Sequence, residues 1–302
     1  MIEPSSRFVL ANGLQHHVLT WTPKVVKHAR PILIAHGFLD FAWSFHFVAS
    51  ELASRGHVVH AMDWRGHGQT EWIGKGGYYH FVDYLLDLTE LTEALDLTIS
   101  GYGLIGHSMG GTACAMFAGT RPLGLEKLAL LEGMGPPAEE EPEGDDPRLQ
   151  QRIDEWLSGV QKLRAKNSLA SISGKKSRPI KDLAEALARL RVMHPTLDEE
   201  RGLFLAEKAT VLRDGERYFA FDPMHRTSAP IPFRVATFRP QLARIAVKTL
   251  VLNGELGWKP PDHATRIACI PDHEEYTVPK AGHMMHWDAP AHVSELLDGF
   301  FR

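Results

Sequence analysis

Apolar runs alternate with amphipathic stretches along most of the chain, and this alternation predicts its fold. Residues 31–35 and 57–62 are short runs rich in apolar side chains, which is typical of buried parallel strands. Between them, residues 41–55 carry apolar side chains at helical spacing and end at Gly56, which suits a helix C-cap. A strand, a helix and a strand in this order form a β-α-β unit, so we expect a mostly parallel sheet.

The same alternation continues on both sides of this unit. The chain opens with two β-rich runs, 7–10 and 15–21, around Asn12-Gly13, a dipeptide typical of tight hairpins. Further strands are expected at 103–105, 125–131, 249–253 and 275–278, and further helices at 82–97, 109–119, 263–268 and 289–300. The predicted fold class is therefore α/β, with a doubly wound, mostly parallel sheet of eight strands.

A change of composition interrupts this scheme. Residues 136–147 are a run of Pro, Glu, Asp and Gly, which cannot form a core and which we interpret as a linker. Three amphipathic helical stretches and a strand-like segment follow it, at 149–166, 180–192, 198–213 and 218–221. We therefore expect a mainly helical cap at 136–239, inserted into an α/β core made of 1–135 and 240–302.

Composition narrows the class of protein. A chain of 302 residues with 44% hydrophobic content can bury a full core, and a net charge of -4 without a polybasic run argues against nucleic acid as a partner. No apolar run approaches the roughly 18 residues that span a membrane, and the first ten residues lack a signal-peptide pattern. We expect a soluble, cytoplasmic protein that does not bind membranes and whose partner is a small molecule.

Cysteine and histidine usage gives no sign of a metal or a cofactor. Cys114 and Cys269 lie far apart, and neither has a second cysteine or a histidine at ligand spacing. The 17 histidines are scattered along the chain, also without ligand spacing. We expect no disulfide, no metal site and no cofactor.

The segment Gly106-His107-Ser108-Met109-Gly110 offers a candidate nucleophile. It lies between a predicted buried strand and a helix of small residues, and Gly-x-Ser-x-Gly in this context is typical of a nucleophile elbow. A serine hydroxyl needs a base, an acid that orients the base, and donors for the oxyanion. The backbone N–H of Met109, at the start of the helix, is the first expected donor.

The second donor is expected in the loop after an earlier strand. His36-Gly37-Phe38 occupies that position, and the backbone N–H of Phe38 is the candidate. We place His36 and Gly37 beside the substrate, and we expect the His36 side chain to shape this loop through hydrogen bonds.

The base is expected after the last strand. His283 follows Gly282 there and precedes the final helix, which fits the order serine, acid, histidine. His286 is the alternative, but it lies closer to the start of the helix, where a packing or surface role is expected.

The acid of the expected serine–histidine–acid triad departs most from the usual pattern. It usually follows the strand before the last one, but Gly257 stands where an aspartate is expected. The remaining carboxylates are Glu255, in the same loop, and Glu132, at the end of the strand after the nucleophile helix. We favour Glu132, because a carboxylate in an apolar run is costly unless a partner compensates it. Glu255 remains the alternative.

With these residues, the chain resembles the α/β-hydrolase superfamily over nearly its full length, and it looks like the serine hydrolase-like group. The matching segments are His36-Gly37-Phe38-Leu39-Asp40, Asp63-Trp64-Arg65-Gly66-His67-Gly68, Gly106-His107-Ser108-Met109-Gly110-Gly111, Leu131-Glu132-Gly133-Met134-Gly135-Pro136 and Gly282-His283. The resemblance implies a cap inserted after the sixth strand.

The same resemblance bears on the acid and on the reaction. Related haloalkane dehalogenases and some polyketide chain-terminating thioesterases have their acid after the sixth strand, which supports Glu132. Dehalogenases and epoxide hydrolases of this superfamily use an aspartate nucleophile, so the serine at position 108 argues against those activities. Gly257 departs from the commonest pattern.

Two further segments are candidates for roles near the pocket. We interpret residues 63–68 as a structural turn, with Arg65 in an ion pair. Arg226 follows a strand-like stretch of the cap and, if it points into the pocket, would bind a carboxylate or sulfate on the substrate. The alternative for Arg226 is a surface turn.

Several functions fit these residues. The leading hypothesis is a serine esterase or related acyl hydrolase, and carbon–carbon bond hydrolysis would use the same residues. A thioesterase that releases a carrier-bound, polyketide-like acyl chain is the second. A non-catalytic binding protein on the hydrolase fold is the third, favoured only by the displaced acid.

Overall fold

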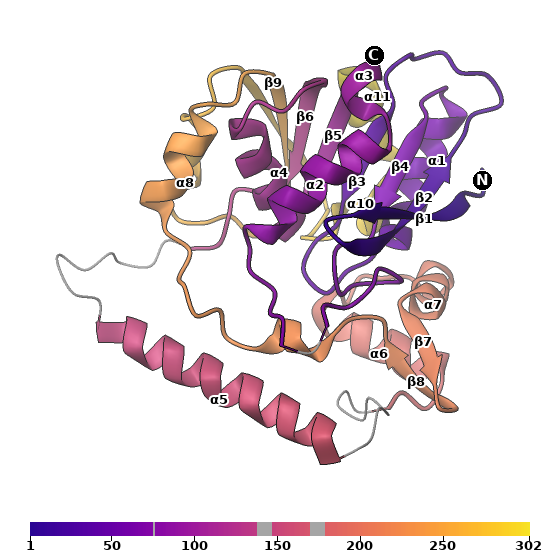
Figure 1. Ribbon diagram of the computed structural model, residues 1–302. Helices are drawn as coiled ribbons and strands as arrows, with labels where there is room; N and C mark the ends of the chain where they lie inside the picture. Colours follow the sequence, from indigo (N-terminus) through magenta and orange to yellow (C-terminus); the bar gives the residue numbers. More distant parts are fainter. Residues whose placement is uncertain (75, 138–146, 170–178) are drawn as a thin grey trace.

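The structure is a computed structural model that describes residues 1–74, 76–137, 147–169 and 179–302 (Figure 1). Most of the predicted linker at 136–147 lies outside the described residues. A single mixed sheet forms the centre of the molecule, with the strand order β1-β2-β4-β3-β5-β6-β9-β10. These strands are β1 (Ser5–Ala11), β2 (Leu14–Trp21), β3 (Ile32–Ala35), β4 (Val59–Met62), β5 (Tyr102–His107), β6 (Leu125–Leu131), β9 (Lys248–Gly254) and β10 (His273–Val278).

The predicted α/β class and the eight-stranded sheet are confirmed. β2 pairs antiparallel with both β1 and β4, whereas every other neighbouring pair is parallel. Consecutive side chains of a strand point to opposite faces of a sheet. In β6, Leu128 and Leu130 accordingly pack into one hydrophobic cluster, and Ala129 and Leu131 pack into the other. The sheet is therefore covered on both faces, as its apolar strands predicted.

Helices cover the two faces. The cluster that contains Leu128 also contains residues of α2 (Asp83–Ala94), α4 (Met109–Gly119), α8 (Val235–Leu242) and α9 (His263–Ile267). The opposite cluster contains residues of α1 (His46–Ser54), α10 (Met285–Asp288) and α11 (Pro290–Phe301). Figure 1 shows α2 and α4 in front of the sheet and α1 and α11 behind it.

Two predicted helices of the core are shorter than expected. Residues 41–55 form the 3-10 turn η1 (Ala42–Phe45) followed by α1. Residues 82–97 form α2, which ends before Asp96, and the short α3 (Leu97–Ser100) follows. Asp96 has a φ of 58°, a left-handed conformation that does not continue a helix.

The segment between β6 and β9, which we call the inserted segment, is mainly helical. It contains α5 (Pro147–Leu169), α6 (Leu183–Met193), α7 (Glu199–Lys208), β7 (Thr210–Arg213), β8 (Glu216–Phe219), the 3-10 turn η2 (Pro223–Arg226) and α8. In Figure 1, α5, α6, α7 and the hairpin lie below the central sheet. α8 runs across the boundary drawn at residue 240, and its Phe238 and Leu242 pack in the core cluster with α4.

The helix predicted at 198–213 requires a correction. α7 ends at Lys208, and Thr210–Arg213 is the strand β7, which pairs antiparallel with β8. Asp214 and Gly215 both have positive φ, at 51° and 78°, which makes them the central residues of a tight hairpin turn. The apolar residues keep a helical spacing beyond Lys208, and for this reason the sequence predicted a helix there. Pairing with β8 makes residues 210–213 a strand instead. In the described part of the chain, no helix is long and apolar enough to cross a membrane.

Candidate active site

Ser108 lies at a sharp turn between β5 and α4. Its φ of 51° and ψ of -119° are strained for a residue with a side chain, and such strain is common where a site fixes a reactive group. The Ser108 N–H donates to the carbonyl oxygen of Leu131, 2.9 Å away. A Cβ on Gly110 would lie 2.3 Å from the His36 oxygen, and one on Gly106 would lie 2.6 Å from the Gly111 Cα. The glycines of the motif are thus required by close backbone approach.

His283 and Glu132 lie together, as the favoured prediction requires. The His283 Nδ1 is 2.5 Å from the Glu132 Oε2, although 151 residues separate the two in sequence. The carboxylate is fully buried, and it also accepts hydrogen bonds from the N–H groups of Gly254 at 2.9 Å and Trp258 at 3.2 Å. These bonds fix the carboxylate against the ring. The Nδ1–H therefore faces Glu132, which leaves Nε2 to face the rest of the site.

Gly257 departs from the common pattern for a steric reason. A Cβ at this position would lie 1.6 Å from the Glu132 Oε1, well inside any contact distance. The Glu132 carboxylate thus occupies the space that a side chain at 257 would need. The alternative acid, Glu255, is exposed and accepts a hydrogen bond from the Lys280 N–H at 2.7 Å. The structure brings Glu132, and not Glu255, to His283.

The loop at 36–40, which we call the oxyanion loop, passes close to the serine. A Cβ on Gly37 would lie 3.2 Å from the Ser108 Cβ. Phe38 and Met109, the two predicted backbone donors, line the same cavity as Ser108. Leu39 has a φ of 56°, a left-handed conformation that a leucine adopts only when its surroundings hold it there.

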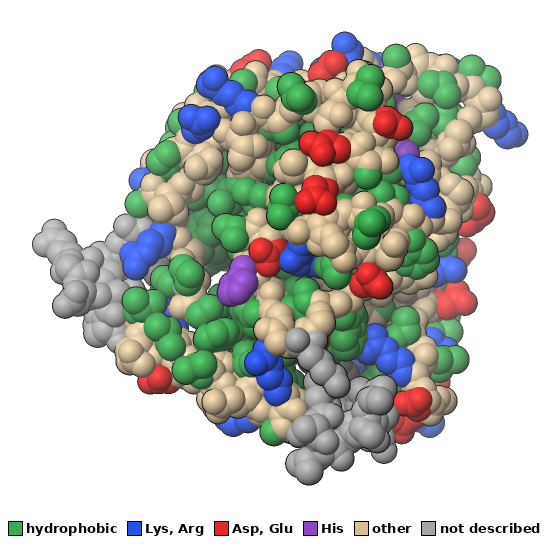
Figure 2. Space-filling model, in the orientation of Figure 1, with side chains coloured by type: hydrophobic (Ala, Val, Ile, Leu, Met, Phe, Trp, Pro, Cys, Tyr) green, Lys and Arg blue, Asp and Glu red, His purple; other side chains and the backbone are tan. Residues whose placement is uncertain are grey.

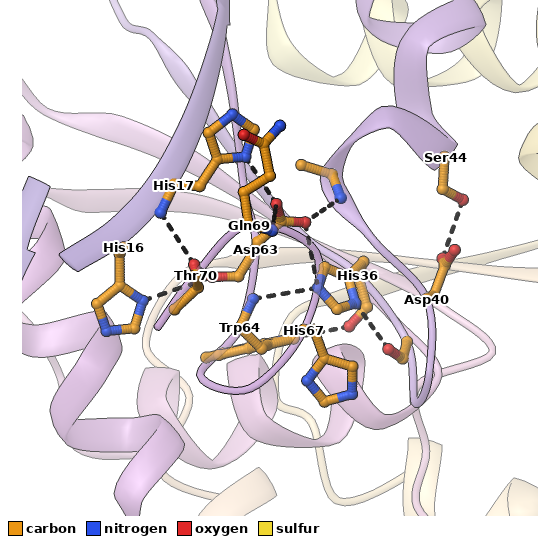
Figure 3. Close-up of polar contacts among 12 residues, drawn as sticks. His16, His17, His36, Asp40, Ser44, Asp63, Trp64, His67, Gln69 and Thr70 are labelled. Atoms are coloured by element: carbon orange, nitrogen blue, oxygen red, sulfur yellow. Dashed lines mark hydrogen bonds and ion pairs between the residues drawn. The ribbon is translucent and has the colours of Figure 1, made fainter. Parts of the chain in front are cut away.

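His36 is buried and shapes this loop from behind. Its Nδ1 donates to the Gly37 oxygen at 2.7 Å, and its Nε2 accepts from the Trp64 N–H at 3.1 Å (Figure 3). Burial lowers the pKa of His36 to about 4, so the ring is neutral at pH 7. The ring is not among the residues that line the cavity. The geometry fits the loop-shaping role expected for the His36 side chain, whereas direct contact with a substrate is not supported.

Asp63 joins the start of η1, just after the oxyanion loop, to the turn at 63–68 (Figure 3). Its Oδ1 accepts from the Ala42 N–H at 2.6 Å, and its Oδ2 bonds to the His17 Nδ1 at 2.6 Å and to the Gln69 N–H at 3.0 Å. Burial alone would raise the pKa of Asp63, but the hydrogen bond and the charge of His17 outweigh it, and the pKa is lowered.

Arg65 forms the ion pair that was predicted for this turn. Its Nε and Nη2 donate to the two carboxylate oxygens of Asp87 at 2.6 and 2.5 Å, and its Nη1 lies 3.1 Å from the Asp83 Oδ2. The arrangement is bidentate and almost completely buried. Arg65 thus supports the turn rather than facing the cavity.

Two further histidines lie behind His283. His286 is fully buried, stacks on Phe45 at 4.1 Å between ring centroids, and bonds through Nε2 to the Ser44 Oγ at 2.9 Å. It therefore packs in the core, as expected for the alternative to His283. The sequence interpretation missed His107, whose Nε2 donates to the His283 carbonyl oxygen at 2.9 Å. Its position directly before the serine was the available signal.

A cavity of about 590 Å³ opens above Ser108, His283 and Glu132. Its walls come mostly from apolar side chains, and Figure 2 shows hydrophobic side chains gathered in and below a hollow on the left of this face. The apolar walls are Phe38, Tyr78, Tyr79, Phe81, Val82, Met109, Met116, Pro136, Ala229, Pro230, Ile231, Pro232, Phe233, Phe238 and Trp258.

The structure does not support Arg226 as a pocket residue. Arg226 is exposed at the end of η2, and its guanidinium carbon lies 4.8 Å from the centroid of the Phe221 ring. The side chain lies over this ring, and Arg226 is not among the residues that line the cavity. Among the residues that line the cavity in the described part of the chain, Arg234 is the one arginine or lysine.

Comparison with known proteins identifies the class. Residues 30–290 match the family model of the alpha/beta hydrolase fold, so the chain belongs to the α/β-hydrolase fold family. A "Serine hydrolase-like protein" of Danio rerio is 24% identical over 290 residues, which cover 93% of this chain and 83% of the relative. A human "Serine hydrolase-like protein" is 33% identical over 102 residues, or 34% of this chain and 49% of that protein.

Solved structures show the same fold over nearly the full chain. A thioesterase domain from the curacin biosynthetic pathway has a TM-score of 0.82 at 24% identity and covers 97% of this chain and 98% of its own. An E-2-(acetamidomethylene)succinate hydrolase has a TM-score of 0.72 at 19% identity, with 98% of each chain covered. At these identities the likeness concerns the fold. Together with the family, it supports a hydrolase.

Proposed function

We propose that the chain is a serine hydrolase that cleaves an ester or another acyl bond of a small molecule through Ser108, His283 and Glu132. The observation that carries this proposal is the buried Glu132–His283 hydrogen bond, in a cavity that Ser108 also lines. A serine at a strained elbow is a site for acyl transfer when a base and an acid accompany it.

In the proposed mechanism, the His283 Nε2 takes the proton of the Ser108 hydroxyl as the Ser108 Oγ attacks the carbonyl carbon. The N–H groups of Phe38 and Met109 bind the oxyanion of the tetrahedral intermediate. The protonated His283 then gives its proton to the leaving alcohol, and an acyl-enzyme remains. Water, deprotonated by His283, repeats the sequence and releases the acid and the free serine.

Glu132 supports this cycle without exchanging a proton. The buried carboxylate holds the His283 Nδ1–H and stabilises the imidazolium that forms at each proton transfer. The Gly254 and Trp258 N–H bonds keep it in place when His283 is neutral. A non-catalytic binding function is not favoured, because the displaced acid was the argument for it and Glu132 contacts His283.

The apolar walls favour a substrate with an apolar acyl or alcohol group. We propose that residues 136–239 form a cap over the core at 1–135 and 240–302, because residues 229–234 supply one wall of the cavity. Thioester hydrolysis is the second candidate, since an apolar cavity of about 590 Å³ would accept an acyl chain attached to a thiol as well as to an alcohol.

A panel of neutral p-nitrophenyl esters and matched acyl thioesters, of increasing chain length, tests the proposal. Wild type should hydrolyse at least one series, and Ser108→Ala should abolish that turnover at an unchanged melting temperature. The higher kcat/KM on acyl groups of equal length decides between ester and thioester. If Ser108→Ala retained wild-type turnover, the proposed function would be wrong.

A further inference from the structure

The oxyanion loop is held by a side chain from another turn of the chain. The Leu39 N–H donates to the Nε2 of His67, 3.2 Å away, across 28 residues of sequence. Leu39 is the residue with the left-handed φ of 56°, and it directly follows Phe38. This hydrogen bond therefore restrains the peptide next to the proposed oxyanion donor.

The tautomer of His67 follows from its two partners. Its Nδ1 lies 3.1 Å from the carbonyl oxygen of Arg65, and a carbonyl can only accept, so the hydrogen is on Nδ1. The Nε2 then carries a lone pair, which the Leu39 N–H requires. If Nε2 were also protonated, its N–H and the Leu39 N–H would both be donors and could not form a hydrogen bond. The bond therefore exists only when His67 is neutral. Burial, followed by the nearby His225 and His36, lowers the pKa of His67 well below its ordinary value, which agrees with this tautomer.

The inserted segment fixes the His67 ring from the other side. The ring of His225 lies 4.1 Å from that of His67 and 3.7 Å from that of Tyr79. The His225 Nε2 also donates to the Arg65 carbonyl oxygen, at 3.2 Å. This oxygen therefore accepts hydrogen bonds from both His67 and His225. The backbones are joined as well: the Gly68 N–H donates to the Ala220 oxygen at 2.6 Å, and the Asp222 N–H donates to the Gly66 oxygen at 2.8 Å.

We propose that His67 is a positioning residue for the oxyanion hole, which holds the loop at Leu39 so that the Phe38 N–H faces the reacting carbonyl. The inference rests on the proposed serine-hydrolase function. It adds a physical link between the inserted segment and the oxyanion hole: the segment packs on His67, and His67 holds the loop. His67 does not contact the substrate, and its effect is on the rate of the acyl-transfer step.

Two polar substitutions separate the two hydrogen bonds of His67. In His67→Gln, the side-chain oxygen reaches the position of Nε2 and can accept from the Leu39 N–H. In His67→Asn, the shorter side chain reaches the position of Nδ1, keeps a donor for the Arg65 oxygen and leaves Leu39 without its acceptor. Both variants are measured on the best ester or thioester of the panel, and their melting temperatures are compared with wild type.

The proposal predicts a kcat for His67→Asn that is lower by about 10-fold or more, at a KM within about twofold, because oxyanion stabilisation acts on the transition state. His67→Gln should keep most of the wild-type kcat. Equal kcat values for the two variants, whether normal or reduced, would overturn the proposal, as would failure of both to fold. These outcomes differ from failure of the proposed function, in which wild type itself would have no Ser108-dependent turnover.

Discussion

At the scale of single residues, steric exclusion between positions 132 and 257 determines from which loop the proposed acid reaches His283. The Glu132 carboxylate, Gly257 and the His283 ring meet at one point, where the loops after β6, β9 and β10 come together. A carboxylate that enters from β6 excludes a side chain at 257, and a side chain at 257 would displace the carboxylate. A glycine at 257 is thus what the observed position of the Glu132 carboxylate requires.

This exclusion predicts that the acid can be moved. Glu132→Gly should lower kcat by about 10²- to 10⁴-fold, the range typical of loss of a triad acid. Adding Gly257→Asp should recover part of the loss, because the new side chain starts where the Glu132 carboxylate was. Gly257→Asp alone should lower activity by crowding Glu132. Gly299→Asp is the matched control, since a side chain at 299 meets nothing within 4 Å. A double variant no more active than Glu132→Gly would contradict this account.

The residues that sequence reasoning identified were those with a local signature. The elbow around Ser108 and the Gly282-His283 pair are short patterns whose chemistry needs few neighbours. Arg226 was different, because the direction of its side chain depends on the η2 turn and on the ring of Phe221. His67 accepts from the N–H of Leu39, and His107 donates to the carbonyl oxygen of His283. Both partners are distant in sequence, and no residue spacing predicts them.

At the scale of elements, periodicity predicted the order of strands and helices but not all of their ends. The buried central strands were recognisable because they are short apolar runs, whereas the mostly exposed β1 was predicted together with β2 from the hairpin dipeptide Asn12-Gly13. The boundary between α7 and β7 could not be recognised, because the apolar residues of 205–212 fit both the helical and the strand period. The hairpin turn at Asp214 and Gly215 makes the second part of this stretch a strand. Tertiary pairing thus overrides the local pattern at such ends.

One contact between elements predicts a pH-dependent stability. Asp298 on α11 is buried, bonds to the His57 Nε2 at 2.9 Å and lies 3.3 Å from the Arg55 Nη1, both just after α1. Burial would raise the pKa of Asp298, but hydrogen bonds from Arg302, His57 and Arg55 lower it from 3.8 to about 2. A carboxyl with a depressed pKa stabilises the fold above its unfolded pKa, and this stability disappears as the pH falls through the folded pKa.

Asp298→Asn should therefore lower the free energy of unfolding by about 2 kcal/mol at pH 7, measured by urea denaturation. The difference from wild type should shrink as the pH falls from about 4 to 2, where the wild-type carboxyl takes up its proton. Glu295→Gln, at an exposed position of the same helix, is the control and should change little at either pH. A difference for Asp298→Asn that stays constant between pH 7 and pH 2 would contradict the account.

At the scale of the whole molecule, the cavity lies between the α/β core and the inserted segment. Met109 and Met116 on α4 supply one wall, and residues 229–234 supply another. In the proposed mechanism the core therefore carries the reacting groups, whereas the inserted segment supplies part of the wall around the space proposed for the substrate. This division explains why the sequence indicated the chemistry and not the substrate, since the volume depends on how the two parts pack.

The size of the cavity should therefore limit the acyl group. Met116→Trp replaces a methionine of the cavity wall with a bulkier indole side chain. It should lower kcat/KM for the longest accepted acyl chain by about 10-fold or more, in line with the cost of overpacking. Acetyl esters should be affected less than about threefold. Met193→Trp is the control, because Met193 is 77% exposed and does not line the cavity. Equal losses for short and long chains would show that the substrate lies elsewhere.

The most direct test of the central claim is the rate at which a fluorophosphonate probe labels the protein, followed by intact-mass measurement and peptide mapping. The account predicts one label, on Ser108, in wild type, no label in Ser108→Ala, and labelling slowed at least about 100-fold in Glu132→Gln because the base loses its orienting carboxylate. Glu255→Gln should label at the wild-type rate. Slow labelling of Glu255→Gln with normal labelling of Glu132→Gln, or no label on Ser108 in wild type, would contradict it.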